Sequence, residues 1–193
     1  MAKARVRALP KGTLTLERVM DDLVADGLLA ADNKRLLSGI YAGQESSDKH
    51  ALEIIAERDW ADASNPHRKL TLERLTEWLA QRADLPNVRI DPLKIDVASI
   101  TDVMSYAYAK RFNIVALEVS DDAVTIATAE PYVREWEHEL EGILRRKIHR
   151  VLANPREIER YLLEFYTLAR SVQGAHRDQG QELAPGVQNL EQL

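Results

Sequence analysis

The side chains that could carry chemistry in this chain are few and scattered. None of the histidines stands in the H-x-x-x-H spacing that places two imidazoles on one metal ion; they are His50, His67, His138, His149 and His176. No Ser–His–Asp arrangement can be argued from spacing. The chain has no cysteine, so disulfide bonds and thiolate metal sites are excluded. The sequence therefore predicts no catalytic residue and no metal ligand.

Phosphate-binding loops are also absent from the sequence. Its eight glycines fit neither G-x-x-x-x-G-K-[ST] nor G-x-G-x-x-G, in which close glycines let backbone N–H groups surround a phosphate. We therefore expect that this chain alone is not an enzyme and does not hydrolyse ATP.

One dense basic cluster remains, formed by Arg145, Arg146, Lys147, His149 and Arg150. Such a cluster is either a solvated surface or a patch for an acidic partner. The net charge of -5 argues against a general nucleic-acid binder, and only the basic N-terminal arm favours that alternative.

The elements that must position these residues begin with a helical region at residues 13–84. Apolar residues recur at helical spacing in four segments. The first segment ends at Gly27 and holds Leu16, Val19, Met20, Leu23 and Val24. The second is capped by Asp32 and buries Leu36, Leu37, Ile40 and Tyr41. The third holds Leu52, Ile55 and Ala56, and the fourth, capped by Thr71, turns Leu72, Leu75 and Leu79 inward. Residues 59–66 are expected to form a connection.

This region contains a faint internal repeat. Residues 18–29 and 50–61 share a basic residue, an apolar residue, an apolar pair and then a turn, and each copy leads to a helix ending in Gln, at Gln44 and Gln81. The pattern alone favours two ordinary amphipathic hairpins over a functional repeat.

The second region, residues 85–172, alternates strand and helix patterns. We expect a strand at 88–90 ending at Asp91-Pro92, one helix from Asp96 to Asn113, and a hairpin of strands 114–119 and 123–129 ended by Glu130-Pro131. A helix burying Val133, Trp136, Leu140, Ile143 and Leu144 follows, then a strand at 147–153. Asn154 and Pro155 start a last helix that buries Ile158, Tyr161, Leu162, Phe165 and Leu168.

The predicted fold class is thus α+β: a helical subdomain followed by a small α/β subdomain with a mixed three- to four-stranded sheet. Residues 1–12 are expected to be a flexible basic arm, and residues 173–193 a linker or cut end. The composition is 45% hydrophobic, and the sequence contains no apolar run long enough to span a membrane. We expect a cytoplasmic protein that does not insert into a membrane.

A series of short stretches between residues 70 and 166 follows a recognisable order: TLERLTEWLA (71–80), LP (85–86), IDPLKID (90–96), YAKRFNIVAL (108–117), VTIATAEP (124–131) and IERYLLEFY (158–166). Through these stretches, residues 70–166 resemble the N-terminal domain of the type II secretion and type IV pilus assembly ATPases. This resemblance implies a docking module that tethers a hexameric motor to the cytoplasmic domain of an inner-membrane platform protein. ATP and magnesium would then belong to a downstream motor domain, and Arg145, Arg146 and Arg150 are the candidate partner-binding residues.

The helical region resembles the paired motif that binds cyclic di-GMP in some members of that family, R-L-G-x-x-L-V-x-x-G followed by a helix ending in Gln. The resemblance implies that the ligand contacts would come from Arg18, Leu23, Val24, Gly27, Gln44, His50 and Gln81. The chain departs from the motif at Met20 and Leu52, which replace the first glycine of each copy. His50 stands for the second arginine and Asp59 for the last glycine.

Overall fold

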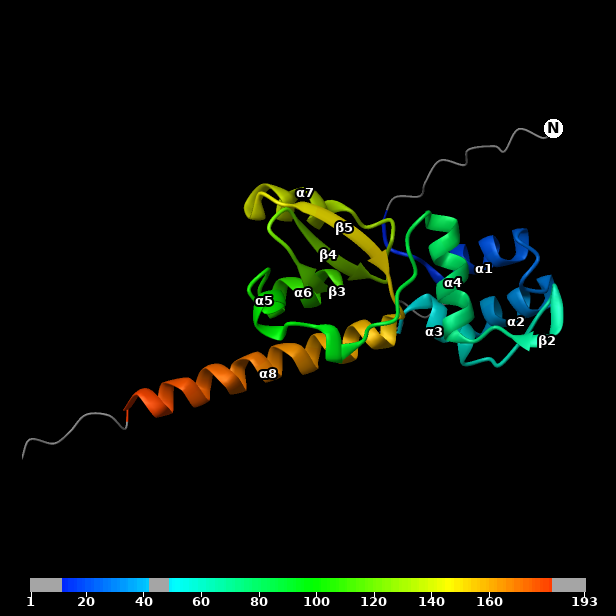
Figure 1. Ribbon diagram of the computed structural model, residues 1–193. Coiled ribbons are helices and arrows are strands. Elements are labelled where there is room, and N and C mark those ends of the chain that lie inside the picture. The colour runs from blue at the N-terminus through cyan, green and yellow to red at the C-terminus, as the bar shows by residue number, and fades with distance from the viewer. Residues whose placement is uncertain (1–11, 42–48, 182–193) are drawn as a thin grey trace, which may run out of the picture.

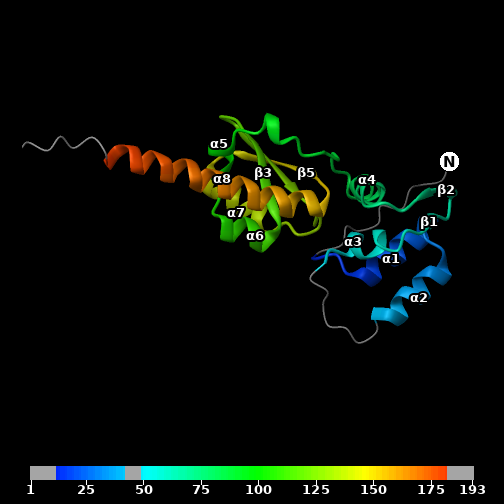
Figure 2. The same cartoon turned by 90° about the horizontal axis from the view of Figure 1, so that it is seen from below.

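The computed structural model describes residues 12–41 and 49–181 (Figure 1). Its buried side chains form two hydrophobic clusters, one in the N-terminal helical region and one around a three-stranded sheet. The two regions lie next to each other, and the last helix projects away from both (Figures 1 and 2). The predicted α+β class is confirmed.

The four expected helices of the first region are present. They are α1 (Leu16–Ala25), α2 (Ala31–Tyr41), α3 (Ala51–Ala56) and α4 (Leu72–Ala83). Gly27 ends α1 as expected, with φ +75°, a left-handed conformation that glycine adopts without a steric cost. The Gly27 and Leu28 N–H groups donate to the carbonyls of Val24 and Leu23, which forms a Schellman motif.

The apolar face expected for α2 is wrong in part. Leu37 is buried, whereas Leu36 and Ile40 are 59% and 48% exposed. The line Asn33, Leu37, Tyr41, spaced by four residues, makes the least exposed face of α2. Leu36 and Ile40 each precede that line by one residue, about 100° around the helix.

The expected connection at 59–66 contains a small β-hairpin instead. Strands β1 (Ala61–Asp62) and β2 (Asn65–Lys69) pair antiparallel. The Asp62 carboxylate makes the turn by accepting hydrogen bonds from the Ser64 N–H at 2.8 Å and the Ser64 hydroxyl at 2.5 Å. Strands this short, joined by a turn that a buried aspartate closes, show little of the alternating apolar pattern that predicts a strand.

The second region is built on a mixed sheet of β3 (Ile114–Val119), β4 (Ala123–Thr128) and β5 (Lys147–Leu152), in the order β3-β4-β5. Strands β3 and β4 form the expected antiparallel hairpin. Strand β5 runs parallel to β4 after the crossover helix α7 (Glu135–Leu144).

The expected strand at 88–90 is reduced to one bridge, between Asn87 and Leu152. Beyond it the chain leaves the sheet because Ile90 donates its N–H to the Glu157 carboxylate. Asp91 then caps a short 3₁₀ turn, η1 (Pro92–Lys94), by accepting the Leu93 N–H at 3.2 Å.

The single helix expected from Asp96 to Asn113 is broken into α5 (Val97–Thr101) and α6 (Tyr106–Phe112). Ser105 caps the second piece, and Asn113, with φ 49°, ends it as expected. The break frees the Met104 carbonyl, which accepts a hydrogen bond from the Tyr166 hydroxyl at 2.7 Å. Burial raises the pKa of Tyr166 to about 12, so this hydroxyl stays protonated as a donor.

The last helix, α8 (Pro155–Gln181), begins where expected, with the Asn154 side chain accepting the Arg156 N–H at 2.9 Å. It runs into the segment expected to be a linker. Two residues expected to be buried are largely exposed, Ile143 at 68% and Leu168 at 52%.

The boundary between the two hydrophobic clusters does not follow the order of the sequence. Tyr132 and Leu152 come from the second region, yet both are buried in the cluster of the helical region. The α/β region therefore completes the core of the helical region. Within the described ranges, no helix has the length and apolar content needed to cross a membrane.

Candidate functional site

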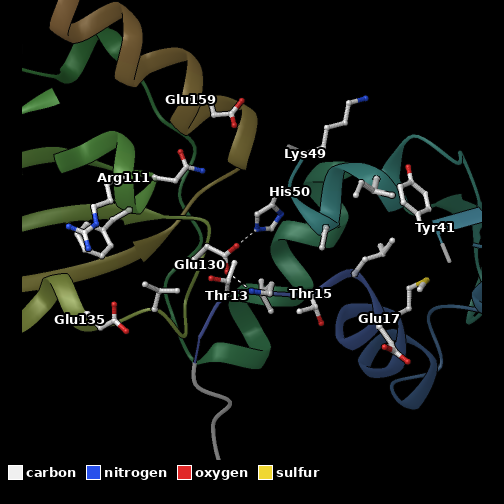
Figure 3. Close-up of a pocket in the computed structure, with 18 of the residues that line it drawn as sticks. Thr13, Thr15, Glu17, Tyr41, Lys49, His50, Arg111, Glu130, Glu135 and Glu159 are labelled. Atoms are coloured by element: carbon white, nitrogen blue, oxygen red, sulfur yellow. Dashed lines mark hydrogen bonds and ion pairs between the residues drawn. The ribbon is translucent and has the colours of Figure 1, made fainter. Parts of the chain in front are cut away.

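A cleft of about 1010 Å³ lies between the helical region and the end of the sheet (Figure 3). Its walls are the start of α1, the start of α3, the end of α6 and the residues that follow β4. Side chains of both charges line it, including Glu17, Lys49, His50, Arg111, Glu130 and Glu159.

His50 is the most buried ionisable side chain on the α3 side of this cleft, at 6% exposure. It caps α3, since its Nδ1 accepts the Leu52 N–H at 3.2 Å. A ring nitrogen that accepts a hydrogen bond carries no proton, so neutral His50 holds its proton on Nε2. That nitrogen lies 3.4 Å from Oε1 of Glu130, too poorly oriented to count as a hydrogen bond.

Glu130 connects three segments that are distant in the sequence. Its side chain is 12% exposed, and the carboxylate faces His50 with one oxygen (Figure 3). The other oxygen accepts the Leu14 N–H at 2.8 Å. Sequence reasoning gave Glu130 only the role of a strand terminator, because nothing local marks a glutamate that will pair with a residue eighty positions earlier.

The residues expected to contact cyclic di-GMP are only partly brought together. Arg18, Leu23, Val24 and Gly27 lie on α1 and its C-terminal turn. Leu23 is fully buried and Val24 packs against the same core, so neither side chain is free for a ligand. Arg18 is half-buried, with its guanidinium 5.7 Å from the centre of the Tyr132 ring.

Of the remaining three expected contacts, the structure describes two. Gln81 is exposed on α4, and His50 faces Glu130 in the cleft. Gln44 lies outside the described residues.

A cluster that sequence reasoning missed joins the ends of α1 and α4: Arg82 forms ion pairs of 2.6 Å with both Asp22 and Asp26.

The basic cluster is divided by the structure. Arg150, one of the expected partner contacts, is only 13% exposed on its side chain. It donates to the Pro131 carbonyl at 2.9 Å and lies 3.2 Å from Glu137. Strand alternation explains this, because Ile148 and Arg150 share the face covered by α7. Arg145 is exposed and Arg146 half-buried at the turn between α7 and β5.

The electrostatics of Arg150 and Glu137 fit a structural pair. Burial lowers the pKa of Arg150, and the Glu137 charge opposes that effect. For Glu137, burial acts to raise the pKa, but the hydrogen bond from Arg134 and the charge of Arg150 outweigh it, so the pKa lies below its ordinary value. Both groups are thus ionised at neutral pH.

A further ion cluster joins α8 to α3. Arg156 donates from Nε to Glu53 at 2.8 Å and from Nη2 to Glu57 at 3.0 Å. Glu53 is 6% exposed.

Among the residues that the structure describes, no group of three or more histidines and carboxylates is placed to hold a metal ion.

Comparisons with known proteins place this geometry in context. Residues 83–172 match the MshEN domain family. The type IV pilus assembly ATPase TfpB of Acinetobacter baylyi is 35% identical over 176 residues. That alignment covers 90% of this chain and 30% of TfpB, so the chain spans less than a third of this relative's length.

Solved structures are similar to this chain at low sequence identity. A structure of MshE with cdg has a TM-score of 0.50 and 14% identity, covering 77% of this chain and 99% of the MshE chain. The N-terminal domain of XpsE has a TM-score of 0.48 and 14% identity, covering 80% of this chain and 96% of that one. The MshE likeness shows a common fold.

Proposed function

This chain belongs to the N-terminal domains of type II secretion and type IV pilus assembly ATPases, with an MshEN domain at residues 83–172, and from this premise we propose that it docks a motor to its membrane platform. The partner is the cytoplasmic domain of an inner-membrane platform protein. The ATP- and magnesium-dependent chemistry belongs to a motor domain of the hexameric parent. The chain acts in the cytoplasm, at the inner membrane, through this partner.

The observation that carries the proposal is the surface at the turn between α7 and β5. Ile143 is 68% exposed there, and Arg145 and Arg146 follow it at the end of the helix. Within the described ranges neither arginine has a recorded ion pair. An exposed isoleucine beside two arginines suits a partner surface that is apolar at its centre and acidic at its edge.

Binding of the full chain to the purified cytoplasmic domain of the platform protein, followed by biolayer interferometry, tests this proposal. We expect the double substitution Arg145→Glu and Arg146→Glu to weaken binding at least about tenfold, mainly by slowing association. Arg68→Glu, at an exposed position on β2, is the matched control and should leave the affinity unchanged. Equal affinity for the double variant and the wild type would reject this surface.

A second candidate function is the binding of cyclic di-GMP by residues 18–81. It is supported by the fold shared with MshE, whose structure was solved with cdg, which we read as cyclic di-GMP. It is also supported by the partly exposed Arg18 on α1. The burial of Leu23 and the position of His50 beside Glu130 leave fewer side chains for the ligand than the motif implies.

Isothermal titration calorimetry with cyclic di-GMP tests this second function. Binding heat that is lost in Arg18→Ala and kept in Arg35→Ala would establish it, because Arg35 is 80% exposed and pairs only with Asp32 next to it on α2. Absence of heat with tens of micromolar wild-type protein would reject it.

A further inference from the structure

We infer that α3 is a coupling element that connects the state of the cleft to the position of α8. Helix α3 is short, but its two ends contact different parts of the α/β region. Its first residues line the cleft, and Glu53 and the C-cap residue Glu57 pair with the first turn of α8. This role does not depend on which partner or ligand the chain binds.

The N-terminal end of α3 is held from the cleft side. His50 caps the helix with Nδ1 and turns Nε2 toward Glu130, and Glu130 holds the Leu14 N–H just before α1. Figure 3 shows this group at the centre of the cleft. A molecule entering the cleft therefore meets His50, the residue that caps α3, and Glu130 beside it.

The side of α3 that faces α8 is held along its length. Arg156 lies in the first turn of α8, and its guanidinium spans Glu53 in the first turn of α3 and Glu57, its C-cap. Glu53 is buried, so its carboxylate needs this partner more than an exposed carboxylate would.

The body of α3 is stiffly packed between these contacts. Leu52 and Ile55 are 1% and 0% exposed within the cluster of the helical region. A close-packed helix of under two turns moves as one body, so a displacement at His50 reaches Glu53 and then Arg156. Because α8 continues unbroken to Gln181, a small rotation at its first turn becomes a larger displacement at its far end.

Amide hydrogen exchange of the full chain by NMR tests the coupling. Arg156→Met removes the α8 contact, and we expect exchange of the Leu14 N–H to accelerate at least about threefold although Leu14 does not touch Arg156. Glu53→Gln keeps the side-chain shape and should give the same result. Arg160→Met, which removes an exposed pair on α8 that does not involve α3, is the matched control and should leave Leu14 unchanged. An unchanged Leu14 rate in both Arg156→Met and Glu53→Gln would reject the coupling.

The opposite direction is tested by a distance measurement. The chain has no cysteine, so spin labels can be placed cleanly at Arg35→Cys on α2 and Ser171→Cys on α8. We expect Glu130→Gln to broaden the distribution of label separations, since one amide oxygen cannot replace two carboxylate oxygens. Glu135→Gln, at another carboxylate lining the cleft, should leave it unchanged. A distribution in Glu130→Gln that is identical to that of the wild type would show that the contact is only local and overturn the inference.

Discussion

The helical region and the α/β region are stabilised in different ways. The α/β region has its own sheet, with β4 paired on both sides and a core that contains the fully buried Trp136. The helical region has only the two-stranded hairpin as a sheet, borrows Tyr132 and Leu152 for its core, and is tied at its helix ends by ion pairs. The stability of the helical region therefore depends on the α/β region more than the stability of the α/β region depends on the helical one.

The largest expected effect is in the core of the α/β region. Trp136→Ala should lower the free energy of unfolding by roughly 3–5 kcal/mol, because it leaves a large cavity among close-packed residues. Urea unfolding monitored by circular dichroism measures the change. Leu93→Ala, at a position 94% exposed, should change stability by less than about 0.5 kcal/mol. Equal losses in the two variants would contradict the assignment of the core.

Leu152→Ala tests the dependence of one region on the other. Its expected cost is roughly 2–5 kcal/mol, and the loss should appear mainly in the helical region because the side chain packs there. Hydrogen exchange resolves the two regions: amides of α4 should lose more protection than those of β3. Greater loss in β3 would mean that Leu152 serves its own sheet first.

Substitutions at two glycines should change stability by smaller amounts, and in opposite directions. Gly27→Ala should destabilise by about 1–2 kcal/mol, since its left-handed backbone places a Cβ too close to a carbonyl oxygen. Gly39→Ala, inside α2 with open space around the new Cβ, should stabilise by roughly 0.5–1 kcal/mol. Thermal unfolding of both variants measures this contrast, and a destabilising Gly39→Ala would show that α2 is not held as a helix there.

The smallest expected effect is a pH dependence from Glu137. Its folded pKa lies below the ordinary value of 4.5, despite burial, because of Arg134 and Arg150. A lowered folded pKa adds stability above the unfolded pKa, and that stability is lost as the pH falls through the folded value. Unfolding measured at pH values below 4.5 should thus depend less on pH in Glu137→Gln than in the wild type. Glu118→Gln, on the exposed side of β3, should keep the wild-type slope.

The sequence was most informative where local chemistry decides the structure. The hairpin of β3 and β4, the left-handed stop at Asn113 and the Asn154-Pro155 start of α8 all follow from residue types at fixed positions. The helix break before Ser105 was missed, because its advantage is a hydrogen bond between Tyr166 and Met104, sixty-two residues apart.

The candidate site was less predictable for the same reason. Arg145 and Arg150 look alike in the sequence, and only the strand alternation and the position of α7 turn Arg150 inward. The contacts between α3 and the second region, His50 with Glu130 and Glu53 with Arg156, join residues from opposite halves of the chain. Periodicity and motif spacing carry no information about such pairs.

The place of Leu152 also bears on how shorter versions of this protein should be made. A fragment that begins at residue 85 would keep every strand of the larger sheet, but it would expose the apolar surfaces of Leu152 and Tyr132 that are now buried in the cluster of the helical region. Such a fragment should be less soluble than the whole chain and prone to self-association. The point at which the sequence changes character is therefore a poor place to cut for expression.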